Sequence, residues 1–237
     1  MNDFSTFKTS NHALFDFVSA FPEPAHIKDS VSRKYIFSNK HNLTVYGINN
    51  PEKIVGLTVH DLDNFMNPYW GEGFANQIGD FDTIVIKRQS TLTDENRIFL
   101  DKYGLLHIQN MTKVPILNSE NKVSAILTTS FDITKRINRF VIFNKYKNLY
   151  RKKRQACDYL MKHMNINMFF NEVLSEKEII CLLHMTENSS HKSVAKKMNV
   201  STKTIESHVN NIINKLKLKT VSELLEFLRK PNNGNKI

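Results

Sequence analysis

Polar and basic side chains gather in one short segment of the last third of the chain. Their types suit contact with a polyanion, because lysine ammonium groups neutralise phosphates and asparagine amides pair with base edges or phosphate oxygens. The residues are Lys203, Asn210, Asn211, Lys215, Lys217 and Lys219. This set suggests a nucleic-acid contact, provided that one helix carries the side chains on its outer face.

Four short helices are predicted around this segment. Ser175 and Glu178 have the spacing of a capping box, which marks the start of the first helix. A second helix follows, and after a turn at 199–201 either Ser201 or Thr202 caps a third. The third helix has a core-facing apolar stripe made of Ile205, Val209, Ile212, Ile213 and Leu216. Two short helices joined by a three-residue turn predict a helix-turn-helix, whose second helix fits the major groove.

The segment 174–228 resembles the LuxR-type DNA-binding domain. It aligns without gaps through LSEKE and through SVAKKMNVSTKTIESHVNNIINKL. The resemblance implies that the helix from about Thr202 to Leu216 is the recognition helix. It places Glu206, Ser207 and Asn210 at base-facing positions, and Lys203, Thr204, His208, Asn211, Lys215 and Lys219 near the DNA backbone. Glu206 stands where the family commonly has a basic residue, so the operator sequence of relatives does not transfer.

The charge of the chain is divided unevenly. The whole chain carries +10, but residues 1–134 hold 12 Lys and Arg against 15 Asp and Glu, a balance of −3. Residues 135–237 hold 21 against 8, a balance of +13. A basic half of this kind favours nucleic acid first and an anionic membrane second, with a solvated lysine-rich surface as the plain alternative. The division suggests two domains with different partners, with boundaries that we place at 1–134 for the first domain, 135–170 for a linker or signal helix and 171–237 for the DNA-binding domain.

The first half has the pattern of an α+β domain. A helix is predicted at 11–21, and a mixed helical zone at about 40–88. Strands are predicted before and after that zone, at 25–29, 34–39, 97–103, 105–117 and 122–133. Because sequential strands usually neighbour each other, we expect a five-stranded antiparallel sheet with helices on one face. A pocket can form between the two layers.

This half, over about residues 11–136, resembles a PAS domain. The features are Pro24, the stretches AHIKDSVSRKYIFSN and IVGLTVHDL, the strand ending KVPI and the closing SFDITKR. The resemblance implies a sensor that holds a small molecule, although the family fixes no ligand and the cofactor stays unknown. We predict an apolar pocket lined by Phe37, Val85, Ile108 and Ile126, with a filled core as the alternative. Residues 1–134 contain no cysteine, so covalent flavin chemistry is not expected.

The segment from 133 to about 166 contains no proline or glycine and is predicted to form one helix. Its apolar residues follow a partial heptad pattern, which is compatible with a dimerising signal helix and equally with a solvated basic linker helix. Asp132 or Thr134 would cap its start. A second surface for dimerisation is the last helix, with Leu224, Leu225 and Leu228.

Other classes of function find little support. Two cysteines exclude a disulfide framework, and Cys181, His184 and His191 lack the fourth ligand of a zinc site. No P-loop or hydrolase motif is present, so an enzyme is not predicted. No apolar run is long enough to span a bilayer and no secretory signal is expected.

The sequence therefore predicts a cytoplasmic transcription regulator without a membrane contact. Its expected partners are double-stranded DNA, a second copy of the chain, a small molecule in the PAS-like domain and RNA polymerase. The alternative is a PAS-based interaction or dimerisation module with an auxiliary basic DNA-binding tail.

Overall fold

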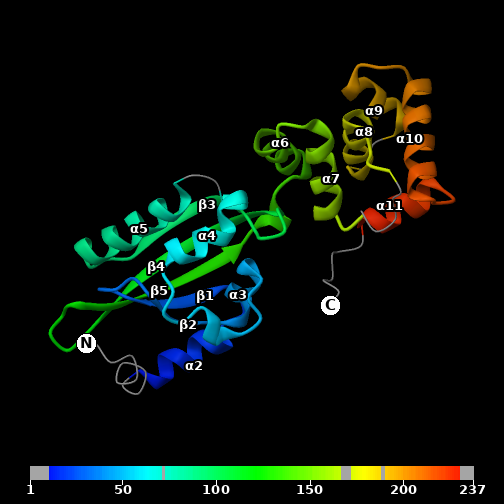
Figure 1. The fold of residues 1–237 in the computed structure, drawn as a ribbon. Coiled ribbons are helices and arrows are strands. Elements are labelled where there is room, and N and C mark those ends of the chain that lie inside the picture. Colours follow the sequence, from blue (N-terminus) through cyan, green and yellow to red (C-terminus); the bar gives the residue numbers. More distant parts are fainter. Residues whose placement is uncertain (1–10, 71–72, 167–171, 188–189, 230–237) are drawn as a thin grey trace. The chain divides into compact units, whose positions relative to one another are not determined.

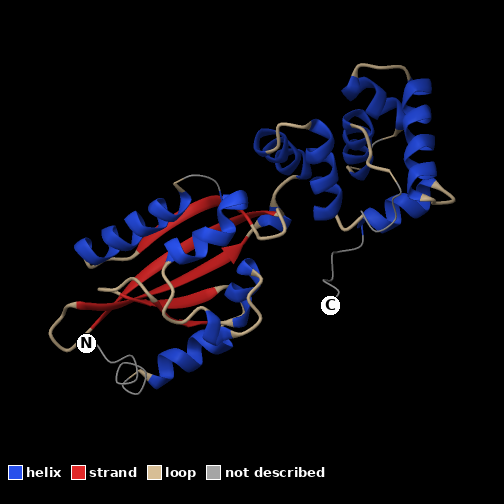
Figure 2. Ribbon diagram, in the orientation of Figure 1, coloured by secondary structure: helices blue, strands red, loops and turns tan. Residues whose placement is uncertain are grey.

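The computed structural model describes residues 11–70, 73–166, 172–187 and 190–229. The chain divides into two compact units, Met1–Arg136 and Ile137–Ile237 (Figure 1). The strands of the described residues lie in the first unit, and the described part of the second unit is helical (Figure 2). The predicted α+β class is confirmed.

The first unit contains a five-stranded antiparallel sheet, as predicted. The strands are β1 (Ala25–Asp29), β2 (Tyr35–Ser38), β3 (Leu92–Leu100), β4 (Leu106–Leu117) and β5 (Val123–Asp132). Their order in the sheet is β2-β1-β5-β4-β3. The two N-terminal strands therefore pair beside the last strand of the unit, and β3 forms an edge.

One strand differs from its predicted bounds, since β3 begins and ends earlier than 97–103. The polar residues at its start gave no strand signal, but an edge strand can keep polar side chains in water while its backbone pairs with β4, as at Leu92 opposite Lys113. The strand ends where the Asp101 carboxylate accepts the backbone N–H groups of Tyr103 and Leu105. This side chain closes the turn into β4.

Helices cover both faces of the sheet. The predicted helical zone forms α3 (Lys40–Tyr46), the 3-10 helix η1 (Pro51–Lys53), α4 (Val59–Trp70) and α5 (Phe74–Arg88). The helices α4 and α5 pack along the strands on one side (Figure 1). The N-terminal helix α2 (His12–Ala20) packs on β1 and β2 from the other side, where Phe15 and Val18 join a buried apolar cluster with Ile27.

The interior strand β1, between β2 and β5, shows why both faces are filled. All five of its residues are buried. Successive side chains on a strand point to opposite faces. Ile27 accordingly packs under α2, whereas Lys28 reaches Asp82 of α5 on the other side. One face of the sheet is apolar, and the other carries buried charge.

The second unit is a set of short helices. They are α6 (Arg139–Leu149), α7 (Lys153–His163), α8 (Glu176–Thr186), α9 (His191–Met198), α10 (Thr202–Leu216) and α11 (Val221–Arg229). The predicted capping box is present at the start of α8, where Ser175 and Glu178 bond to each other's backbone N–H groups. The predicted apolar stripe of α10 is buried at four of its five positions, and Ile213 is half-buried.

The prediction of one continuous helix over 133–166 is wrong. Tyr150 and Lys152 adopt extended backbone conformations, so the segment forms two helices, α6 and α7, that pack on each other. The break lets the rings of Tyr150 and Tyr159 stack with their centroids 4.4 Å apart. The apolar residues that α6 and α7 bury can thereby pack within one chain, whereas a single helix could bury them only against a partner.

The predicted cap of this segment is also wrong. Asn138, rather than Asp132 or Thr134, caps α6 by accepting the backbone N–H of Phe140 at 2.8 Å. Asp132 instead accepts the N–H of Thr134, whose hydroxyl accepts the N–H of Ile108 on β4. These bonds fix the end of β5 to its neighbouring strand. The chain then passes through the 3-10 helix η2 (Thr134–Arg136) before unit 2 begins.

Candidate nucleic-acid interface and sensor cavity

The helices α9 and α10 form the helix-turn-helix. Asn199 ends α9 in the left-handed conformation, with φ 54° and ψ 49°, which asparagine tolerates better than most residues. Two residues later Ser201 caps α10 by accepting the backbone N–H of Thr204 at 3.1 Å. The turn therefore needs only residues 199–201. The buried stripe of α10 then holds the helix so that its polar face points outward.

The predicted contact residues lie along that outer face. The exposed ones are Lys203, Glu206, Ser207, Asn210 and Asn211, and the half-buried ones are Thr204, His208 and Lys215. Lys219 is exposed after the end of the helix. The structure thus brings the residues of α10 together on one surface.

Lys215 forms a contact within the chain that the sequence did not reveal. Its Nζ lies 2.9 Å from Oε2 of Glu178 on α8, and Glu178 is only 4% exposed. Burial raises the pKa of Glu178, but hydrogen bonds from Lys215 and Ser175 outweigh burial and lower it overall. The ion pair fastens α10 to the start of α8. Capping by Glu178 was predictable, whereas its cationic partner lies 37 residues away in the chain.

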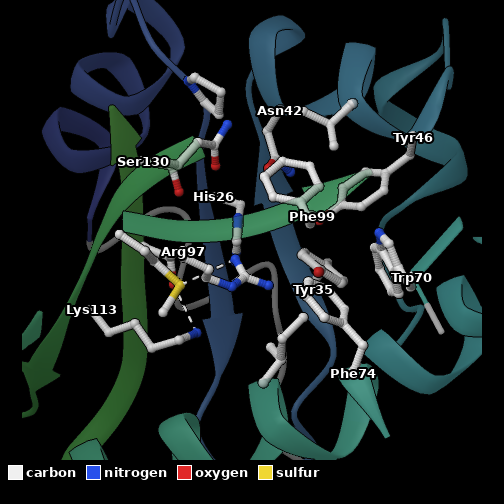
Figure 3. A pocket seen from close by; sticks show the side chains of 16 residues that line it. His26, Tyr35, Asn42, Tyr46, Trp70, Phe74, Arg97, Phe99, Lys113 and Ser130 are labelled. Carbon is white, nitrogen blue, oxygen red and sulfur yellow. Dashed lines mark hydrogen bonds between the residues drawn. The ribbon is translucent and has the colours of Figure 1, made fainter. Parts of the chain in front are cut away.

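A cavity lies in unit 1 between the sheet and the helices α3, α4 and α5 (Figure 3). Its volume is about 30 Å³. The wall combines aromatic side chains with polar ones from the strands, and it includes Tyr46, Phe74, Phe99, Gln109 and Ser130. The site is therefore more polar than the apolar pocket that we predicted.

The four residues predicted to line a pocket do not line this cavity. Phe37 pairs with Ile27 and packs on Phe15 on the α2 side of the sheet. Ile108 precedes the cavity residue Gln109, so it points to the opposite face. Val85 and Ile126 are fully buried outside the cavity wall. Apolar character identified these residues as core, but it could not tell which face of the sheet each one serves.

Three buried polar atoms of the cavity wall have no hydrogen-bond partner among the described residues. They are Nε2 of His26, Nε1 of Trp70 and Nε of Arg97. Burial, and then the charges of Lys28 and Lys113, lower the pKa of His26 well below its usual value. The imidazole is therefore neutral at physiological pH. Buried polar atoms normally find partners, so this concentration of unpaired ones marks a place for a ligand or water.

A buried ionic cluster borders the cavity. Asp82 of α5 accepts Nζ of Lys28 at 3.0 Å and Nζ of Lys113 at 2.5 Å, and each of the three side chains is at most 1% exposed. Burial raises the pKa of Asp82, but the two ammonium groups outweigh burial and lower the pKa to about 2. Burial lowers the pKa of Lys113, a cavity residue, to about 8. A lysine within a strand of buried residues is the sequence signal that could have revealed this cluster.

His107 joins the cavity wall to the end of the sheet. Its ring stacks on Phe99, with the centroids 5.2 Å apart. Its two nitrogens lie 2.8 Å from Asp132 and 3.3 Å from Asp101. Burial lowers the pKa of His107, but these carboxylates outweigh burial and raise it to about 9. The protonated ring therefore ties β4 to the residue that orders Thr134.

Comparison with known proteins supports a family for part of the chain. Residues 172–228 match the family model for bacterial regulatory proteins, luxR family. The oxygen regulatory protein NreC of Staphylococcus epidermidis is 37% identical over 59 residues, which are 25% of this chain and 27% of that protein. The Fimbriae Z protein of Escherichia coli is 35% identical over 57 residues, 24% of this chain and 27% of that protein. The chain spans only 27% of the length of these curated relatives.

A solved structure matches most of the chain. The crystal structure of a phage VqmA–DPO complex aligns with a TM-score of 0.50 and 21% identity, over 93% of this chain and 88% of that chain. At this identity the likeness shows the fold alone.

Among the described residues no helix has the length and apolar character needed to cross a membrane. The match of residues 172–228 and the geometry of α9 and α10 agree, so this part of the chain is similar to the luxR family of bacterial regulatory proteins in sequence and in its helix-turn-helix, and the unit before it has the predicted PAS-like fold.

Proposed function

We propose that the chain is a sequence-specific DNA-binding transcription regulator whose PAS-like domain senses a small molecule. The observation that carries the proposal is the outer face of α10. It presents cationic, amide and hydroxyl groups together, and a buried apolar stripe holds it in place. A helix of this kind fits the major groove, where each base pair shows its own pattern of donors and acceptors.

The base-reading role of α10 is tested with Asn210→Ala. The preferred duplex is first found by a binding selection with the full chain. Because the amide would pair with a base edge, its loss should relax the preference at one or two base pairs, by roughly 1–3 kcal/mol. Asn144, which is exposed on α6, provides the matched control Asn144→Ala. An unchanged site preference of Asn210→Ala would show that α10 does not read bases through this residue.

The phosphate contact is better tested at Lys203 than at Lys215. Lys203 is exposed in the first turn of α10, whereas Lys215 already pairs with Glu178. Lys203→Ala should weaken all sequences about equally and reduce the dependence of log K on log salt by roughly one unit. A loss confined to one sequence would instead assign Lys203 to base recognition.

The active form is proposed to be a homodimer on DNA, because one helix-turn-helix contacts too few bases for strong specificity. In α11 the surface predicted for pairing is partly used within the chain. Leu224 is fully buried, Leu225 is half-buried, and the side chain of Leu228 lies outside the described residues. Light scattering of the full chain on its selected duplex should give two copies per duplex, and one copy would refute the dimer. Recruitment of RNA polymerase remains a further proposal.

The sensory role is tested by comparing the full chain with residues 137–237, which correspond to unit 2. If the PAS-like domain controls DNA binding, a molecule extracted with the protein from cells should change the affinity of the full chain. It should leave the affinity of 137–237 unchanged. Ligand binding shifts an equilibrium only when one conformation binds the ligand better. If the affinity of the full chain for DNA is the same with and without such extracts, the PAS-like domain has a structural role and does not sense a ligand.

A further inference from the structure

We propose that the cavity of the PAS-like domain binds a small carboxylate anion, with the guanidinium of Arg97 as its anchor. This inference rests on the proposed sensory function and names the chemical class of its ligand. The cavity is lined by side chains from unit 1 only, so the site is complete within that unit (Figure 3).

The unpaired nitrogen atoms of the cavity wall favour a ligand that accepts hydrogen bonds. Trp70 Nε1 and Arg97 Nε can only donate, and a neutral His26 can donate from one nitrogen. None of the three atoms has a partner among the described residues, and His26 is 7% exposed. A buried donor without an acceptor is costly, so these groups together favour an occupant rich in acceptor oxygens.

The charges around the cavity require that this acceptor be an anion. Three cations lie on this side of the sheet: Lys28 and Lys113 are buried and share the buried carboxylate of Asp82, and Arg97 is half-buried in the cavity wall. Within the described part of the chain Arg97 forms no ion pair, although Asp94 and Asp82 act on it from a distance. Positive charge thus exceeds negative charge in a region of low dielectric. One bound carboxylate would offset part of that excess.

The contacts of Arg97 with its neighbours leave its guanidinium suited to bind such a ligand. Its guanidinium carbon lies 4.6 Å from the centre of the Phe74 ring and 5.6 Å from that of Phe99. Its Nη1 lies 3.6 Å from the sulfur of Met111, which is a weak acceptor. The aromatic rings keep water from the flat faces of the guanidinium. Its edge remains available for the paired hydrogen bonds that arginine makes with carboxylates.

The volume sets the size of the ligand. About 30 Å³ is room for roughly two water molecules, so large cofactors do not fit without rearrangement. A carboxylate of the size of acetate, propionate or pyruvate can replace those waters with modest movement of the aromatic walls. We therefore expect an anion of a few heavy atoms rather than a flavin or a haem.

The test uses the full chain and a reporter that is already in place. Trp70 is the single tryptophan of the sequence and lines the cavity, so intrinsic fluorescence reports on this site. Acetate, propionate and pyruvate are titrated at constant ionic strength, and acetamide and propionamide serve as neutral matches of the same shape. Calorimetry provides the stoichiometry. We expect saturable binding of at least one carboxylate at one site per chain, and at least about tenfold weaker binding of its amide.

Variants assign the binding to Arg97. Arg97→Gln should weaken carboxylate binding by at least about tenfold, and Arg97→Lys should restore part of it. Arg88→Gln, at an exposed position of α5, should bind as the natural chain does. Circular dichroism of each variant checks that it is folded. If the natural chain binds amides as well as carboxylates, or binds none of the carboxylates, the inference is overturned without reference to any variant.

The inference can fail while the proposed function stands. DNA affinity is measured in the same samples. If the chain binds its selected duplex and responds to a neutral molecule from cells but to no carboxylate, the proposed sensory function stands and the proposed carboxylate site is refuted. If the chain binds carboxylates but no duplex, the proposed DNA-binding function is refuted and the proposed carboxylate site stands.

Discussion

Asp82 is the single residue on which the charge balance of the PAS-like domain depends most. Asp82→Asn would leave Lys28 and Lys113 buried without a carboxylate. A buried charge without a partner destabilises the folded state by more than an intact buried ion pair stabilises it. We therefore expect the free energy of unfolding to fall by about 3–5 kcal/mol. Urea denaturation followed by Trp70 fluorescence measures the loss. Asp80→Asn, at an exposed position of the same helix, should change it by no more than about 0.5 kcal/mol. Equal midpoints for the two variants would rule out a stabilising role of the cluster.

His107 makes the stability of the same domain depend on pH. Its pKa is raised from 6.5 to about 9, so the folded state binds the proton more tightly than the unfolded state. The resulting stabilisation is complete below about pH 6.5 and is lost as the pH rises through about 9. Urea midpoints of Trp70 fluorescence should fall across this interval. His107→Gln should remove that part of the decline, and parallel curves for the two proteins would contradict the assignment.

At the scale of elements, the pair α6 and α7 belongs structurally to unit 2, together with the helix-turn-helix. Lys147 of α6 and Lys153 of α7 both reach Glu176 at the start of α8, at 3.3 and 3.2 Å. Phe140 packs on His184 of α8 with ring centroids 4.6 Å apart. These contacts explain why the segment is more than a linker. A movement of α6 would therefore displace α8, and Glu178 of α8 is paired with Lys215 of α10.

A core substitution in α6 tests this placement. Phe143 is 1% exposed, and Phe143→Ala should reduce the stability of unit 2 by about 3–5 kcal/mol because it leaves a cavity. Faster labelling of the buried thiol of Cys181 on α8 would report the loss. Val141→Ala, at an exposed position of the same helix, is the control. A solvated linker helix would leave the labelling rate the same in both variants.

At the scale of the whole molecule, the chain contains a separate natural probe for each unit. Its single tryptophan lies in unit 1, and both cysteines lie buried in unit 2. Because the two units have separate cores, we expect urea to unfold them with separate midpoints. Asp82→Asn should move only the fluorescence transition, and Phe143→Ala only the thiol-labelling transition. Coincident shifts of both probes in either variant would show that the chain unfolds as one cooperative unit.

The sequence by itself determined the features that depend on local spacing. The apolar stripe of α10, the capping box at Ser175 and the five strands follow from periodicity and from side-chain chemistry within a few residues. The resemblance of residues 174–228 to the LuxR-type domain agrees with the family match because its motifs are contiguous. Such signals do not require knowledge of which distant segments meet.

Only the tertiary structure decided what depends on long-range pairing. The break at Tyr150 has no proline or glycine to mark it and arises because α6 and α7 can pack on each other. The cavity is formed by residues up to 106 positions apart, from Pro24 to Ser130, and its polar wall depends on which face each strand residue occupies. The ion pairs of Asp82 and of Lys215 likewise join elements that only folding brings together, because a charge can be buried only where its partner is also present.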